Sequence, residues 1–337
     1  MKPLVSILMP FRDAEATPDE ALQSILDQDE SRWELVAVDD HSGDGSAALV
    51  RALAARDHRV RLYPNPEKGL VSALNHGLRQ CRGPLVARMD ADDRMRPQRL
   101  STHLAHFRTT PRLTLSATQV SLFPETAIQA GYREYVRWQN ACLTPEQIAR
   151  ELYVEAPFAH PSIAFRREAV LDLGGYHEGP FPEDYELWLR LFHSGHRMEK
   201  LPQVLLEWRE SPNRLSRTDP RCSRSAFDRL RARYLARDPR LLERRDDFVI
   251  WGAGRKTRRR CDHLLQQGFH PRAWIDIDPR KIGNRIGETP VVGPEWLEVN
   301  GRPFVLVYVA NHGAREEIME VLEEMGYRPG KDCLAVG

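Results

Sequence analysis

Short apolar runs alternate with helical patterns in the N-terminal part of the chain, and this alternation limits the folds open to it. Runs at residues 5–9, 33–38, 60–63 and 85–89 are typical of buried strands. Helix signals lie between them, such as Thr17-Pro18-Asp19-Glu20, which combines a capping box with proline at the first helical position. This order predicts an α/β fold with a parallel sheet and right-handed crossovers.

Polar and acidic residues follow three of the predicted strands. The segments are Pro-Phe-Arg at 10–12, Asp-Asp-His-Ser at 39–42 and Asp-Ala-Asp-Asp at 90–93. The carboxyl ends of parallel strands share one edge of a sheet, and ligands bind there. We therefore expect the three segments to border one crevice.

The Asp90-Ala91-Asp92 motif predicts a site for a divalent cation. Alternate side chains of an extended chain point the same way, so Asp90 and Asp92 can face one ligand. Carboxylate oxygens suit Mg²⁺ or Mn²⁺, which neutralises a diphosphate leaving group. A solvated acidic turn is the alternative, because aspartate-rich turns are common.

Composition narrows the partners and the compartment. The 49 lysine and arginine residues nearly balance the 48 aspartate and glutamate residues, so no nucleic acid partner is expected. Five cysteines lie far apart without a Cys-x-x-Cys pair, which indicates a reducing compartment. No apolar stretch reaches the roughly 18 residues of a membrane span. We expect a cytoplasmic protein, and any membrane association is expected to be peripheral, on the cytoplasmic face.

The length of 337 residues favours two domains. We expect a first domain over residues 1–212 and a small Rossmann-like α/β domain over residues 247–337. The arginine-rich segment between them, residues 213–246, is interpreted as a basic helical linker. Acidic residues interrupt its arginines, which favours a solvated helix over a surface for anionic lipid.

The predicted second domain carries part of a dinucleotide-binding fingerprint. Gly252 and Gly254 follow a strand and open a helix, and Asp276 comes about 20 residues later. Thr257 replaces the third glycine of that fingerprint, which weakens an assignment to NAD. A nucleotide, a nucleotide sugar, and no ligand at all remain open, the last with the domain serving for docking or homo-oligomer formation.

Five ordered segments resemble glycosyltransferase family 2, whose members have the GT-A fold. The resemblance covers about the first two-thirds of the chain. The segments are residues 5–12 (VSILMPFR), 38–46 (VDDHSGDGS), 68–70 (KGL), 89–93 (MDADD) and 182–191 (PEDYELWLRL). This implies a GT-A nucleotide-sugar-binding domain with a mixed, mostly parallel sheet.

The resemblance also implies roles for individual residues on the donor side. Asp92 would be the principal metal ligand, and Asp90 would lie near the ribose or the sugar. The nucleotide would be bordered by Pro10, Arg12, Asp39, Asp40 and Lys68, with Asp39 or Asp40 near the base. Many relatives carry asparagine or a small polar residue where this chain has Arg12.

On the acceptor side, Glu183 and Asp184 match the family's acidic motif, in which the aspartate is the general base. Direct displacement at the anomeric carbon needs such a base on one face and charge stabilisation of the leaving group on the other. Helix N-terminal charge is the alternative interpretation of this pair. His160 is balanced between a sugar-site role and a structural one, whereas Tyr185 and Trp188 are expected in the core.

The leading hypothesis is therefore a metal-dependent inverting glycosyltransferase. It would move a hexosyl or related sugar from a nucleoside-diphosphate donor, with UDP the commonest among similar proteins, to a glycan or polysaccharide acceptor. One alternative is a non-catalytic nucleotide-sugar sensor or scaffold. Another is a bifunctional protein that modifies sugars through its C-terminal domain.

Overall fold

The computed structural model describes residues 2–212, 214–309 and 313–337, and the chain divides into two compact units. The first comprises Met1–Pro145, Pro157–Gly179 and Glu183–Thr218, and the second comprises Glu146–Ala156, Pro180–Pro182 and Asp219–Gly337. Most of the arginine-rich segment expected as a linker thus belongs to the second unit.

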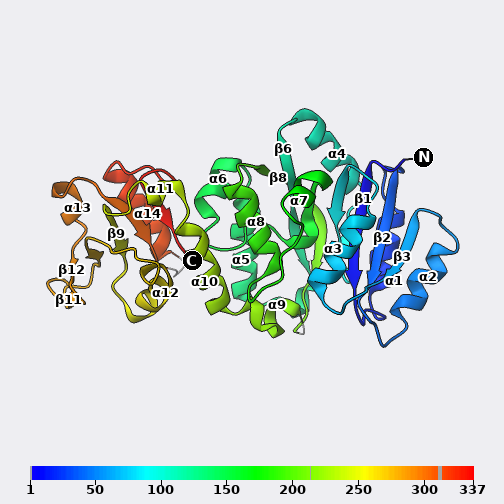
Figure 1. Cartoon of the computed structure of the whole chain (residues 1–337), viewed down its shortest axis with the longest axis horizontal. Helices are drawn as coiled ribbons and strands as arrows, with labels where there is room; N and C mark the ends of the chain where they lie inside the picture. The colour runs from blue at the N-terminus through cyan, green and yellow to red at the C-terminus, as the bar shows by residue number, and fades with distance from the viewer. Residues whose placement is uncertain (1, 213, 310–312) are drawn as a thin grey trace. The chain divides into compact units, whose positions relative to one another are not determined.

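The first unit is built on an eight-stranded sheet (Figure 1). The first four strands of the chain run parallel to one another. The next in space, β7, is antiparallel to its neighbours β4 and β6, and β6 is parallel to β8. This confirms the mixed, mostly parallel sheet. In spatial order the strands are β3 (Val60–Pro64), β2 (Trp33–Asp39), β1 (Val5–Phe11), β4 (Leu85–Arg88), β7 (Ile163–Arg166), β6 (Leu113–Phe123), β8 (Arg197–Arg209) and β5 (Arg94–Met95).

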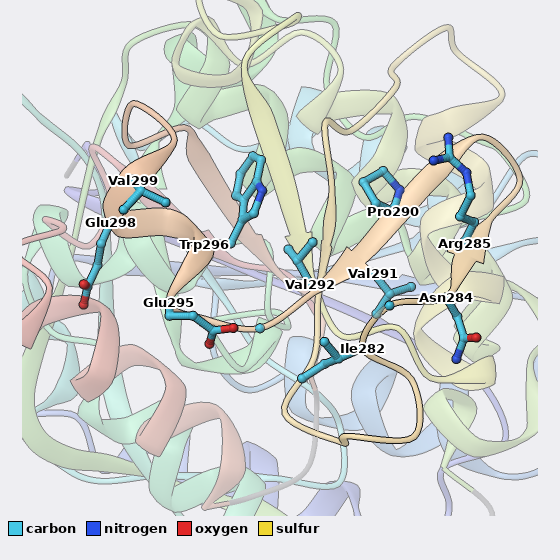
Figure 2. Close-up of a pocket in the computed structure, with 12 residues that line it drawn as sticks. Ile282, Asn284, Arg285, Pro290, Val291, Val292, Glu295, Trp296, Glu298 and Val299 are labelled. Atoms are coloured by element: carbon cyan, nitrogen blue, oxygen red, sulfur yellow. The ribbon is translucent and has the colours of Figure 1, made fainter.

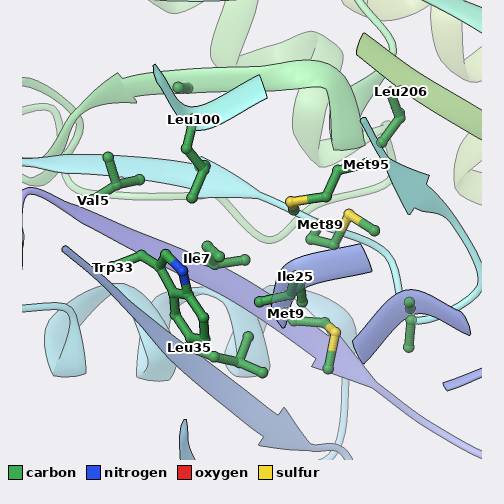
Figure 3. Packing of buried hydrophobic residues seen from close by; sticks show 14 of the residues in the cluster. Val5, Ile7, Met9, Ile25, Trp33, Leu35, Met89, Met95, Leu100 and Leu206 are labelled. Atoms are coloured by element: carbon green, nitrogen blue, oxygen red, sulfur yellow. The ribbon is translucent and has the colours of Figure 1, made fainter. Parts of the chain in front are cut away.

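Strand β1 forms the centre of the core because every one of its residues is buried. Figure 3 shows Ile7 and Met9 of β1 among Ile25, Leu35 and other apolar side chains from neighbouring elements. The register sets Phe11 opposite Asp39, so the carboxyl ends of β1 and β2 lie at the same level of the sheet. The polar segments after these strands therefore start side by side.

Helices connect and cover these strands. They are α1 (Pro18–Leu26), α2 (Ser46–Ala54), α3 (Leu70–Gln80), α4 (Arg99–Thr109), α5 (Ala130–Ala141), α7 (Arg167–Asp172), α8 (Glu183–His193) and α9 (Leu215–Thr218). Pro18 begins α1 as predicted, but the expected capping box was wrong. The Thr17 side chain makes no capping bond, because its hydroxyl donates to the carbonyl of Ala14 at 3.3 Å.

The second unit contains a six-stranded sheet. Its five main strands have the spatial order 3-2-1-4-5 when counted along the chain, and all four of their pairings are parallel. That order is one of the doubly wound α/β folds, which confirms the Rossmann-like prediction. In spatial order the strands are β11 (Arg285–Ile286), β12 (Thr289–Val292), β10 (Trp274–Ile275), β9 (Phe248–Trp251), β13 (Phe304–Val307) and β14 (Cys333–Ala335).

Ion pairs join α10 to α12 within this unit. Asp228 of α10 accepts from Arg231 at 3.0 Å and from Arg260 of α12 at 3.3 Å. Helix α10 thus packs against α12, the helix that follows β9 in the Rossmann-like fold. The helices of the unit are α6 (Pro145–Glu151), which begins at the boundary residue, α10 (Arg224–Leu235), α11 (Pro239–Leu242), α12 (Arg255–Leu265), α13 (Trp296–Val299) and α14 (Ala314–Glu324). Among the residues that the structure describes, no helix combines the length and apolar character needed to span a bilayer.

Candidate functional site

Three carboxylates gather on the turn that follows β4. Asp90, Asp92 and Asp93 each offer an oxygen, and these atoms all lie within 4.8 Å of one another. Asp90 and Asp92 are half-buried, whereas Asp93 is buried. Like charges this close favour a bound cation, because each carboxylate raises the free energy of the others in ionised form.

The raised pKa values of two of these carboxyl groups are consistent with a site for a hard cation. Burial, followed by the charge of Asp90, raises the pKa of Asp92 to about 6. Burial and both neighbouring carboxylates raise the pKa of Asp93 well above its usual value. The second oxygen of Asp93, Oδ2, is also buried without a hydrogen-bond partner among the described residues. A divalent cation would satisfy that oxygen and stabilise all three ionised forms.

Asp93 was not assigned a role from the sequence. The prediction assumed an extended chain, in which adjacent side chains point to opposite sides. The chain instead turns after β4, with the amide of Asp93 3.4 Å from the carbonyl of Asp90, and this brings a third acid to the cluster. The sequence signal for this role was Asp93 itself, the third aspartate of the Asp-Ala-Asp-Asp segment at 90–93.

Arg88 is a second functional candidate that the sequence did not reveal. It is the last residue of β4, its side chain is 3% exposed, and its guanidinium forms an ion pair with Asp90. Its charge also lowers the pKa values of Asp184 and Tyr176 against the effect of their burial. The buried guanidinium of Arg88 therefore acts on the acidic turn and also on the predicted general base. The signal was an arginine within an apolar strand.

Glu183 and Asp184 occupy the first turn of α8, as the alternative based on helix charge also required. Burial, and then the adjacent charge of Glu183, raise the pKa of Asp184 to about 7. Its Oδ1 accepts the amide of Tyr185 at 2.7 Å. A carboxyl group that titrates near neutral pH is well matched to general-base catalysis.

The aromatic residues beside this motif are structural. Tyr185 and Trp188 are fully buried, which confirms their place in the core. His160 is buried too, with Nε2 3.0 Å from the hydroxyl of Tyr176. Burial, and then the charge of Arg88, hold the pKa of His160 well below its usual value, so that its ring is neutral.

The residues predicted around the nucleotide lie at the carboxyl ends of β1 and β2 and on the adjoining loops. Asp40 is buried, and its Oδ1 accepts from Asn65 Nδ2 at 2.7 Å and from the amide of Gly69 at 2.8 Å. Through these two hydrogen bonds, Asp40 fixes the loop that carries the exposed Lys68. The half-buried Asp39 accepts the amide of Ser42 at 3.0 Å.

The other two members of this set lie on or just after β1. Pro10 is buried in β1 opposite Val38 of β2. Arg12 follows the strand, and 46% of its side chain is exposed. Its Nε lies 3.4 Å from Asp13, so the nearest acid is its own neighbour in sequence.

Two arginines, one at the end of β8 and one after it, complete the surroundings of the acidic turn. The backbone amide of Arg209 donates to Asp93 Oδ1 at 2.7 Å, and its Nε donates to the carbonyl of Asp92 at 2.7 Å. The guanidinium of Arg214 lies 4.0 Å from the ring centre of Trp208 and donates to the hydroxyl of Tyr132 at 2.7 Å. Its positive charge opposes the effect of burial on the pKa of Asp92.

In the second unit, Gly252, Gly254 and Asp276 lie at the carboxyl ends of β9 and β10. Gly252 has φ of +115°, and a Cβ there would lie 3.0 Å from the Thr257 side chain. Asp276 is engaged by the fold itself: Oδ2 accepts from the amide of Ala253 and from Lys281 Nζ, both at 3.0 Å. Gly254, the N-cap of α12, has open space around it.

Known proteins resemble this chain over the part that holds the acidic cluster. The model of glycosyl transferase family 2 matches residues 6–174. The amylovoran biosynthesis glycosyltransferase AmsE of Erwinia amylovora is 31% identical over 192 residues, which is 57% of this chain and 70% of the relative. An Escherichia coli UDP-Gal:alpha-D-GlcNAc-diphosphoundecaprenol beta-1,3-galactosyltransferase is 29% identical over 216 residues, 62% of this chain and 75% of the relative.

Solved structures show the same fold. The crystal structure of S. aureus TarS 1-349 in complex with UDP-GlcNAc aligns with a TM-score of 0.52 and 16% identity, covering 69% of this chain and 72% of that chain. The GT-A fold predicted for the first two-thirds of the chain is thereby confirmed.

Proposed function

This chain belongs to glycosyl transferase family 2 and is a glycosyltransferase, and from that premise we propose that it is a metal-dependent inverting enzyme. The observation that carries the proposal is the cluster of Asp90, Asp92 and Asp93, linked through buried Arg88 to the electrostatics of Asp184. It unites a site for a leaving diphosphate with a base of suitable pKa.

The reaction follows from this division of tasks. The carboxylate of Asp184 takes the proton of an acceptor hydroxyl, and the oxygen attacks the anomeric carbon as the bond to the diphosphate breaks. Attack from the side opposite the leaving group inverts the configuration. Mn²⁺ or Mg²⁺ held by Asp92, Asp93 and Asp90 would supply charge neutralisation for the departing nucleoside diphosphate.

We further propose a UDP-linked hexose as donor and a glycan or growing polysaccharide as acceptor. Support comes from relatives: TarS is crystallised with UDP-GlcNAc, and the E. coli relative is named for UDP-Gal and a diphosphoundecaprenol-linked sugar. A lipid-linked acceptor is consistent with peripheral association at the cytoplasmic membrane face. In this proposal Pro10, Arg12, Asp39 and Lys68 border the nucleotide, and Asp40 fixes the loop that carries Lys68.

The other two hypotheses receive less support. In the second unit Asp276, which a sensor or a sugar-modifying dinucleotide enzyme would use to bind ribose, already bonds Lys281 and the turn backbone. The raised pKa of Asp184 is also of direct use to a transferase. We assign the chemistry to the first unit.

Transfer assays test this proposal with UDP-hexoses and a panel of glycan acceptors, including lipid-diphosphate sugars. Activity should vanish in EDTA, return with Mn²⁺, and yield a product of inverted anomeric configuration by NMR. Asp184→Asn should bind UDP-sugar as the wild type does, and its turnover number should fall by a factor of about 10² to 10⁴. Full activity in EDTA, or a retained configuration, would contradict the mechanism.

A further inference from the structure

A groove lies at one edge of the sheet in the second unit, with a volume of about 640 Å³. Figure 2 shows apolar side chains along it, among them Ile282, Pro290, Val292, Trp296 and Val299. Val299 is 81% exposed and Ile282 is 38% exposed. Large apolar side chains gathered at one place on a surface commonly mark an interaction site.

The groove has a cause in the topology of the sheet. Parallel strands are normally covered on both faces by their crossover helices. The connection from β10 to β12, residues 276–288, contains only the short strand β11, and none of its residues is helical. The apolar groups of this edge therefore lack the helix that would ordinarily cover them.

The charges of the groove lie at opposite ends. Figure 2 shows Arg285 on one side of the apolar floor and Glu295 and Glu298 on the other. Neither glutamate has a basic ion-pair partner among residues 2–212, 214–309 and 313–337. The guanidinium of Arg285 donates to the backbone carbonyl of Glu288 and lies 3.7 Å from its carboxylate. Both side chains are exposed, and such pairs are weak.

A twofold axis through the apolar floor would exchange these two ends. An interface between two identical copies must be self-complementary, so a basic end and an acidic end on one patch suit it. We propose that this groove is the contact between two copies of the chain, in which Arg285 of one copy faces Glu298 of the other. The apolar side chains of each copy then supply the missing cover. A second copy is favoured over another protein because both complementary ends belong to this one patch.

Sedimentation velocity of the full chain across a concentration series tests the proposal. The wild type should dimerise, and Arg285→Glu or Glu298→Arg should each weaken the dimer about tenfold or more, since each change places two like-charge pairs in the interface. The double variant Arg285→Glu/Glu298→Arg should restore dimerisation. These side chains are exposed, so circular dichroism should show unchanged folding for all three.

A second pair of variants examines the apolar floor. Val299→Asp should weaken the dimer, whereas the control Leu242→Asp, at an exposed apolar position of α11 outside the groove, should not. The proposal is overturned if the wild type stays monomeric up to about 100 μM, well above a micromolar dissociation constant. It is equally overturned if a dimer forms and neither single charge reversal nor Val299→Asp weakens it.

Discussion

At the scale of the residue, Arg88 connects two acids with different tasks. Its guanidinium pairs with Asp90 of the cation cluster, while its charge opposes the effects of burial and of Glu183 on the pKa of Asp184. A buried cation with acids on either side stabilises both ionised forms. We infer that Arg88 positions Asp90 and keeps the base titrating near neutral pH.

This gives a pH-dependent prediction. The base must be ionised, so turnover of the wild type should fall as the pH drops below the Asp184 pKa of about 7. Arg88→Met removes a charge that lowers this pKa, so the acidic limb of the kcat profile should move to higher pH. At a fixed pH on that limb, turnover falls about tenfold for each unit of movement. Arg88→Lys keeps the charge and should shift the limb less.

Arg61→Met is a control, because Arg61 is a half-buried arginine of the same sheet, paired with Glu34 at 2.8 Å. It should lower the melting temperature and leave the pH profile in place. An unmoved limb in Arg88→Met, with activity otherwise measurable, would exclude the electrostatic role and leave only a packing role for Arg88.

At the scale of the element, Asp93 ties the turn after β4 to the end of β8. Asp93 Oδ1 accepts the backbone amide of Arg209, while Oδ2 is buried without a hydrogen-bond partner among the described residues, and the side chain belongs to the carboxylate cluster. One side chain therefore serves both the fold and the proposed metal site. The two roles are separable, because asparagine retains an accepting oxygen without the negative charge.

Asp93→Asn should keep the bond to Arg209 and near-wild-type stability, yet weaken Mn²⁺ binding measured by calorimetry. Asp93→Ala should lose both, and the orphaned amide should lower the free energy of unfolding by about 1–3 kcal/mol. Hydrogen exchange at Arg209 reports the bond directly. Slow exchange in the alanine variant, or unchanged Mn²⁺ affinity in the asparagine variant, would contradict this division of roles.

At the scale of the whole molecule, the two units offer two candidate nucleotide sites. UDP with Mn²⁺ at about 100 times its dissociation constant should stabilise the protein by about 2.7 kcal/mol, raising its melting temperature by several degrees. GDP and CDP should stabilise it less if uridine is recognised. Asp92→Asn should remove the Mn²⁺-dependent part of the shift.

Gly254→Ala tests the candidate nucleotide site of the second unit, as Asp92→Asn tests that of the first. A methyl group at Gly254 meets open space and should not disturb the fold. The UDP shift should persist in it. A shift lost in Gly254→Ala and retained in Asp92→Asn would instead place the nucleotide in the second unit.

Much of this architecture was predictable because periodicity reflects local structure. The strands before Arg12, Asp40 and Asp90 were recognisable as apolar runs, and their alternation with helices implied a parallel sheet. The cooperation of distant residues was not predictable. Asp93 joined the cluster through a turn, and Arg88 acquired its role from neighbours far away in the sequence. The groove at β11 was not predictable either, because it exists where the connection from β10 to β12 contains no helix to cover the apolar side chains.

The bond between Asp93 and Arg209 also bears on the order in which the protein forms. It spans 116 residues of sequence, so the acidic turn cannot close on its partner until β8 has left the ribosome. Strands β1 to β4 come from the first part of the chain and pair with one another, so they can assemble earlier during synthesis. The proposed catalytic site is thus completed late, by contacts of high sequence separation, which are the slow ones to form. A nascent chain that stops short of β8 would have most of its parallel strands and no finished site.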